Sequence, residues 1–114
     1  MYLPKQDIYE LLDGYLPGGV IQNSDNVFTT LPTITFNVAE NAVSLDLSNQ
    51  ITYQDISITI DFWAAGSKVA STMLSDVEQL MRSAGYKLAF STDVPNPDPA
   101  VWHINSRFTT RQGG

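Results

Sequence analysis

The fold of this protein is decided by a stretch in the middle of the chain, residues 51–81, which reads ITYQDISITIDFWAAGSKVASTMLSDVEQLM. Over its first half, apolar and polar residues alternate, which is the pattern of a strand with one buried face. The apolar side would hold Ile56, Ile58, Ile60 and Phe62, and the other side Tyr53, Asp55, Ser57, Thr59, Asp61 and Trp63. We therefore predict a long strand over residues 51–63.

The second half of the same stretch predicts an amphipathic helix over residues 68–84. The Ala-Ala-Gly sequence at residues 64–66 breaks the strand, and Ser67 is expected to cap the helix. Apolar residues recur at helical spacing on one face, namely Val69, Met73, Val77, Leu80, Met81 and Ala84. Gly85 should close the helix in a left-handed conformation. Such a helix packs its apolar face on a sheet.

Working outward toward the N-terminus, we expect a helix over residues 4–16, because Pro4 suits a first helical turn and an apolar stripe follows it. That stripe comprises Ile8, Leu11, Leu12 and Tyr15. A loop is expected over residues 17–31. Two short alternating strands then follow, at residues 33–38 and 43–47, joined by a tight connection at Glu40 and Asn41. With the long strand they would form an antiparallel meander, since parallel pairing needs a long crossover.

Toward the C-terminus, Tyr86, Leu88 and Phe90 alternate with polar or small residues and predict a fourth strand. A proline-rich loop is expected at residues 92–99 and a last strand at 100–111. That strand would place Trp102, Ile104 and Phe108 on one side and His103, Asn105, Arg107 and Thr109 on the other.

The element order is therefore α-β-β-β-α-β-β. It predicts a single α+β domain over residues 1–114, built as a two-layer, mainly antiparallel five-stranded sheet with two helices packed on one face. The loops at about 17–31 and 92–99 are expected to be mobile.

Composition excludes several classes of protein. The 114 residues include no cysteine, which excludes disulfides, thiolate zinc sites and a cysteine nucleophile. The net charge of −6 argues against a general nucleic-acid binder, because phosphate backbones need clustered Lys and Arg. We also expect no signal peptide and no membrane span.

The charge is uneven along the chain. Residues 1–66 hold eight acids and one base, whereas residues 67–114 hold four acids and five bases. Either identical subunits meet head to tail through surfaces of opposite charge, or the two halves mix within one compact domain.

Candidate catalytic groups are few. His103 is the only histidine, and a general base also needs an orienting partner, so a structural role is the simpler interpretation. Asp55 and Asp61 share one side of a strand but lie about 20 Å apart, beyond the roughly 5–9.5 Å used by paired catalytic carboxylates. We predict no catalytic residue, no metal, no cofactor and no enzymatic activity, and favour a structural or interaction protein.

The pattern resembles the tail terminator (tail completion) proteins of long-tailed bacteriophages. The segment ISITIDFWAAGSKVASTMLSDVEQLM carries the resemblance, together with the closing RFTTR at residues 107–111. Within that segment the matching residues are Ile58, Ile60, Phe62, Trp63 and Ala64 on the strand, then Ala70, Leu74, Val77 and Leu80 on the helix.

The resemblance implies a homohexameric ring at the head-proximal end of the tail tube, which stops tube growth and offers the head a docking surface. The implied partners are the tail tube protein and head-side connector proteins. DNA would pass through the lumen without specific binding, no membrane would be involved, and the protein would reside in the virion after assembly in the host cytoplasm.

We expect the contacts around the ring or lumen to use Asp55, Asp61, Trp63, Arg107 and Arg111. Two alternatives stay open. One is another head–tail junction or tail component, such as a stopper or a tube-like protein with a single helix. The other is a small ligand-binding α+β domain.

Overall fold

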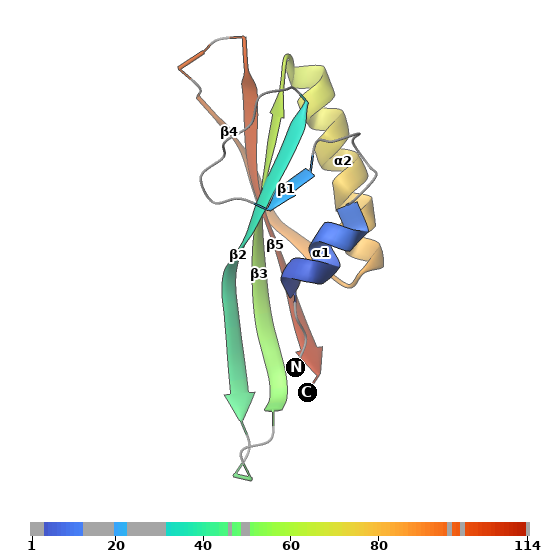
Figure 1. The fold of residues 1–114 in the computed structure, drawn as a ribbon, viewed down its shortest axis with the longest axis vertical. Coiled ribbons are helices and arrows are strands. Elements are labelled where there is room, and N and C mark those ends of the chain that lie inside the picture. Colours follow the sequence, from blue (N-terminus) through green and yellow to red (C-terminus); the bar gives the residue numbers. More distant parts are fainter. Residues whose placement is uncertain are drawn as a thin grey trace.

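The computed structural model describes residues 4–12, 20–22, 32–45, 47–48, 51–95, 97–98 and 100–113. Their helices and strands are α1 (Pro4–Leu12), β1 (Val20–Gln22), β2 (Thr33–Leu45), β3 (Ile51–Ala64), α2 (Ser67–Ser83), β4 (Lys87–Val94) and β5 (Trp102–Gly113). The strands lie in the order β1-β2-β3-β5-β4, and the four from β2 to β4 are antiparallel. Both helices lie on one side of this sheet (Figure 1), so the protein is α+β.

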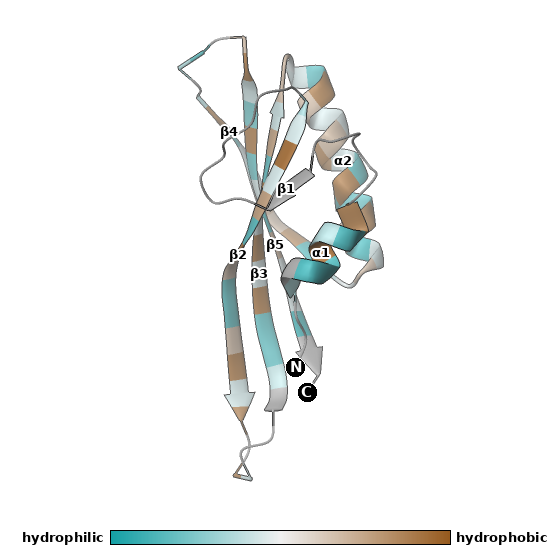
Figure 2. Cartoon of the chain, viewed as in Figure 1, coloured by the Kyte–Doolittle hydropathy of each residue, from teal (hydrophilic) through white to brown (hydrophobic). Residues whose placement is uncertain are grey.

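The core lies between the helices and the middle of the sheet. The predicted alternation on β3 is confirmed, because Ile56, Ile58, Ile60 and Phe62 are all buried. The residues that face them are Ala70, Met73, Val77 and Met81 of α2, with Ile8 and Leu12 of α1. Figure 2 shows these apolar stretches in brown on both helices and on the central strands. Burying each large side chain contributes about 1.5–3 kcal/mol, which fixes both helices to this face.

The predicted meander is wrong in one respect. Residues 33–38 and 43–47 were expected to be separate strands, but β2 runs without interruption from Thr33 to Leu45. Its register against β3 shifts between Val38 and Glu40, so a β-bulge absorbs the residues that resembled a turn. The additional fifth strand is β1, which comes from the expected loop at 17–31 and pairs in parallel with residues 34–36. The rest of that loop lies outside the described residues.

The helix boundaries are tested in part. The first helix is described over Pro4–Leu12, and the rest of the predicted helix, residues 13–16, lies outside the described part of the chain. Ser67 was predicted to cap α2, but it is the first residue of the helix. The cap position belongs to Gly66, whose backbone is extended and which has no side chain to accept a capping hydrogen bond. The left-handed Gly85 is confirmed, with a φ of 91°. Its backbone N–H donates to the Arg82 carbonyl, and the chain turns there into β4.

The two C-terminal strands contribute less to the core than expected. β4 reaches Val94, so part of the expected loop at 92–99 is strand, and Asn96 and Pro99 lie outside the description. Leu88 and Phe90 of β4 are exposed, because β4 is an edge strand with a bulge between them.

On β5, Ile104 and Phe108 are buried as predicted, whereas Trp102 is exposed and donates to the Asp93 carboxylate.

The molecule is elongated, with extents of 54 × 26 × 24 Å. The hairpin of β2 and β3 extends past α1 as a narrow arm (Figure 1). Within the described residues, no helix is long and apolar enough to cross a membrane.

Candidate functional site

The candidate site is the outer face of the sheet, by which we mean the side of β3 and β5 that points away from both helices. All five predicted contact residues lie there, namely Asp55, Asp61 and Trp63 on β3 with Arg107 and Arg111 on β5. The antiparallel register sets Asp61 opposite Asn105 and Asp55 opposite Arg111. The alternation of each strand supplies the face, and the pairing of the strands supplies the neighbours.

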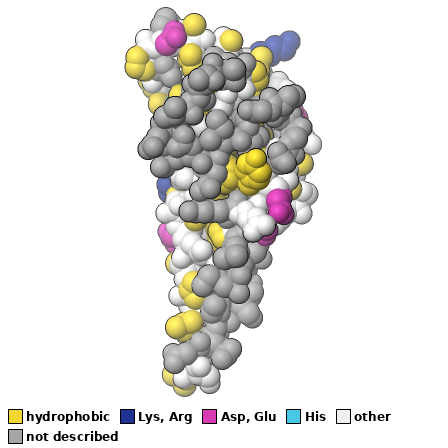
Figure 3. Space-filling view, in the orientation of Figure 1, with side chains coloured by type: hydrophobic (Ala, Val, Ile, Leu, Met, Phe, Trp, Pro, Cys, Tyr) yellow, Lys and Arg dark blue, Asp and Glu magenta, His cyan; other side chains and the backbone are white. Residues whose placement is uncertain are grey.

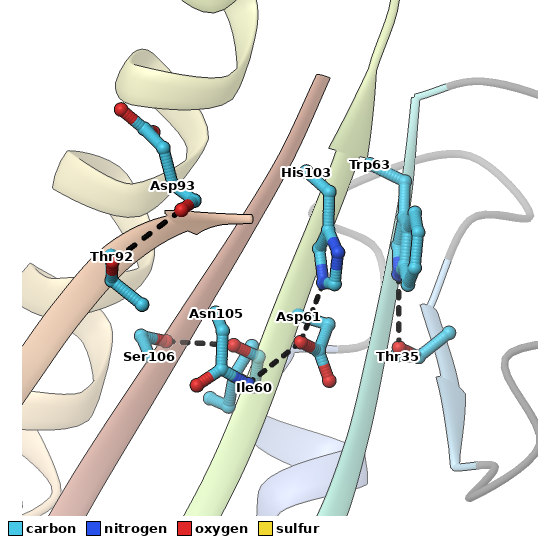
Figure 4. Close-up of polar contacts among 9 residues, drawn as sticks. All are labelled: Thr35, Ile60, Asp61, Trp63, Thr92, Asp93, His103, Asn105 and Ser106. Carbon is cyan, nitrogen blue, oxygen red and sulfur yellow. Dashed lines mark hydrogen bonds and ion pairs between the residues drawn. The ribbon is translucent and has the colours of Figure 1, made fainter. Parts of the chain in front are cut away.

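At one end of this face, Asp61 is the centre of a polar network. The His103 ring nitrogen Nε2 lies 2.7 Å from Asp61 Oδ1, and the Asn105 amide donates to the same oxygen at 2.9 Å (Figure 4). Because a carboxylate only accepts, Nε2 carries the hydrogen of the first contact. The side chains of Asp61 and His103 are 10% and 12% exposed. Asp61 is thus held by two donors in a site that water barely reaches.

Trp63 extends this network to a third strand. Its ring stacks on that of His103 with centroids 3.7 Å apart and an angle of 12° between the planes. Its indole N–H donates to the Thr35 hydroxyl on β2 at 3.1 Å, also drawn in Figure 4. Both Trp63 and Thr35 are buried. The cluster of Asp61, Trp63 and His103 therefore ties β2, β3 and β5 together.

The other end of the outer face is exposed and charged. Arg111 donates to both carboxylate oxygens of Asp55, at 2.8 and 3.3 Å, and its guanidinium lies 4.2 Å over the Tyr53 ring. The hydrogen bond to Asp55, followed by the attraction of its charge, raises the pKa of Arg111. Arg107 lies 5.6 Å over the Phe90 ring. These groups are available to a partner, whereas Asp61 and Trp63 support the sheet from within.

Sequence reasoning missed the partner of His103. Asp61 is 42 residues away, so no spacing along the chain links the two. Both residues were assigned to polar sides of strands, which is the one signal that the sequence offers. The contact follows only once β5 is known to lie beside β3 in this register.

The part of the chain that the structure describes has no group of three or more His, Asp or Glu side chains placed to hold a metal ion. Comparison with known proteins gives no match, either to a protein-family model or to the sequence of a curated protein.

Proposed function

We propose that this protein is the subunit of a homohexameric ring that closes the head-proximal end of a phage tail tube, in the manner of the tail terminators it resembles. The proposal rests above all on the two-sided sheet. One face carries both helices and the core, and the other carries fixed aromatic and charged groups across two neighbouring strands. A subunit of a ring needs this division, because its core must lie away from the surface that lines the lumen or meets neighbours.

The charges of the outer face suit a conduit for DNA. Asp55 offsets the charge of Arg111, and Asp61 lies against His103. Firm binding of a phosphate backbone requires clustered cations, so a lumen lined by this face would let DNA pass without gripping it. The tail tube protein and head-side connector proteins are the partners in this proposal, and the virion is the location.

The tube-like alternative is less well supported. An unpacked second helix would favour it, and α2 instead buries Ala70, Met73, Val77 and Met81 in the core. The ligand-binding alternative gains one observation, since His103 has an orienting carboxylate. That pair is nearly closed to solvent, however, and a surface depression lined by Asp76, Gln79, Leu80 and Ser83 lies on α2. We therefore interpret the Asp61–His103 pair as structural and propose no enzymatic activity.

The experiment is reconstitution of tail capping. Tails from an infection in which the gene is inactivated are mixed with the purified protein and imaged by negative stain. A ring at the head-proximal end alone is the expected result. Protein that is present while the tubes assemble should also restore their uniform length. Protein that binds elsewhere on the tail, or not at all, contradicts the proposed function.

Two arginines give a matched pair of variants. Arg111 and Arg82 are both exposed and both pair with an acid, but Arg82 lies on α2, on the helical side. Arg111 lies near the end of β5, and so near one rim of a ring lined by the outer face, where the tail tube docks in this proposal. Arg111→Glu should weaken binding to tail ends about tenfold, which corresponds to about 1.4 kcal/mol. Arg82→Glu should leave capping unchanged. Equal losses in the two variants would place the contact elsewhere.

A further inference from the structure

We propose that copies of this protein join edge to edge. In this contact β4 of one copy pairs with residues 37–43 of β2 in the next copy. The sheet would then continue from subunit to subunit. This inference rests on the proposed ring and names the surface through which its subunits meet.

Among the strands that the structure describes, two edges of the sheet have pairing capacity that no other described strand uses. β1 pairs with β2 only at residues 34–36, and beyond that point no described strand lies against the outer edge of residues 37–43. At the opposite end of the sheet, β4 pairs with β5 alone among the strands that the structure describes. Such edges present rows of backbone N–H and C=O groups to a partner strand.

Both edges also expose large apolar side chains. Leu88 and Phe90 of β4 are 36% and 45% exposed, and Val43 and Leu45 of β2 are 39% and 56% exposed. Figure 3 shows hydrophobic side chains along the narrow arm that β2 and β3 form. Because the two apolar edges are different surfaces of one chain, their pairing is head to tail, and such a contact builds a ring when its rotation closes.

The strand directions fit this contact. β4 is antiparallel to β5, β5 to β3, and β3 to β2, so β4 and β2 of one copy run in opposite directions. Two copies in the same orientation, placed side by side, therefore bring β4 and β2 together as an antiparallel pair. The alternation of directions continues across the junction without a break.

The faces of the two strands define a register. Phe90 lies opposite Arg107 and Ala42 lies opposite Asp55, so both point to the outer face. Placing Phe90 opposite Ala42 of the next copy sets each side chain against one of the same face. Thr92 then lies opposite Glu40, one pair further along on the same face.

This register shifts each copy along the strands in a way that allows closure. Within one copy, Phe90 pairs with Arg107, which in turn pairs with Thr59 of β3. Ala42 pairs with Asp55 of β3. Placing Phe90 opposite Ala42 therefore offsets neighbouring copies along the strands by the four residues from Asp55 to Thr59. Four strands, β2, β3, β5 and β4, separate successive junctions. A stagger of one residue per strand is that of the eight-stranded, shear-eight barrel, whose strands tilt by about 36°. The helices would lie on the outside of such a ring. The outer face of the sheet, which points away from the helices, would then line the lumen.

Cross-linking tests the contact, because the chain has no cysteine of its own. Ala42→Cys and Phe90→Cys proteins, with tags of different size, are mixed and mildly oxidised. Antiparallel neighbours have Cα atoms about 4.5–5.5 Å apart, which is within disulfide range. A mixed dimer at least about tenfold above that of Ala42→Cys with Ser71→Cys, an exposed position on α2, is the expected result.

A second pair, Glu40→Cys with Thr92→Cys, repeats the test without altering an apolar residue. Phe90→Cys or Thr92→Cys alone could instead form disulfide-linked homodimers in a yield equal to that of the mixed dimer. That result would show a two-fold contact between β4 of two copies and would overturn the proposal. Yields no higher than with Ser71→Cys would overturn it as well.

The outcomes separate this inference from the proposed function. Mixed dimers from a protein that never binds tail ends would leave the edge contact standing and refute the capping role. Capped tails without mixed dimers from either cysteine pair would leave the capping role standing and refute the edge contact.

Discussion

Replacement of Asp61 by alanine is expected to destabilise the fold far more than the same replacement of Asp55. Both acids lie on the outer face of β3, six positions apart. Asp61→Ala removes the acceptor of His103 and Asn105 at a site where the side chains are only 10–12% exposed. A hydrogen bond to a charged group contributes about 1.5–3 kcal/mol and a buried donor left without a partner costs a similar amount, so the expected loss is about 3 kcal/mol.

Asp55→Ala breaks an ion pair whose side chains are 39% and 64% exposed, which water and salt screen. Exposed pairs of this kind contribute at most about 1 kcal/mol, even when both carboxylate oxygens accept.

Urea and thermal unfolding, followed by tryptophan fluorescence, measure the difference. In a domain of this size 1 kcal/mol moves Tm by about 4–8 °C, so Asp61→Ala should lower Tm by more than about 10 °C and Asp55→Ala by a few degrees. Adding 1 M salt should abolish the effect of Asp55→Ala and leave that of Asp61→Ala. Equal losses in the two variants would refute the assignment of Asp61 as the buried anchor of this face.

Further substitutions test other parts of the fold. Trp63→Phe keeps a ring over His103 but removes the hydrogen bond to Thr35, and should cost about 1–2 kcal/mol in urea unfolding. Gly85→Ala should cost about 1 kcal/mol because its φ is 91°, although the nearest atom to an added Cβ is 4.0 Å away; Gly66→Ser should stabilise the start of α2 by a few tenths of a kcal/mol in the same assay. Leu47→Ser at the fully exposed hairpin tip should change the free energy of unfolding by less than about 0.5 kcal/mol.

The sequence predicted the elements whose periodicity is long and regular. Ile56 to Phe62 alternate without exception, and the middle of the predicted α2 stripe is buried at Met73, Val77 and Met81, so each pattern is satisfied by burial of one face. The ends of that stripe were wrong, because Val69 and Ala84 are exposed and Ala70 is buried instead. Both elements were located to within a residue or two.

Where local chemistry was ambiguous, tertiary structure decided. Glu40 and Asn41 resemble a turn, but in an exposed arm a strand tolerates them, because one bulge between Val38 and Glu40 takes up the extra residue. Conversely, Leu88 and Phe90 look like one apolar side of a strand, yet the bulge between them sets Leu88 opposite the buried Phe108 and Phe90 opposite the exposed Arg107, so they lie on opposite faces of the sheet. An alternating pattern assumes a regular strand, and it does not reveal a bulge that moves the following residues to the other face.

The two ends of the outer face call for different experiments, because they differ in burial. Asp61 and Trp63 bind β2, β3 and β5 to one another, so their substitution changes the sheet itself, and a loss of capping in such a variant would report on folding. Arg111 and Asp55 lie in solvent at the other end of the same strands, where a change of charge alters what a neighbour meets without emptying the core. A contact across the outer face must therefore be sought at Arg111 and Arg107, and the buried cluster explains why those side chains stand on a rigid surface.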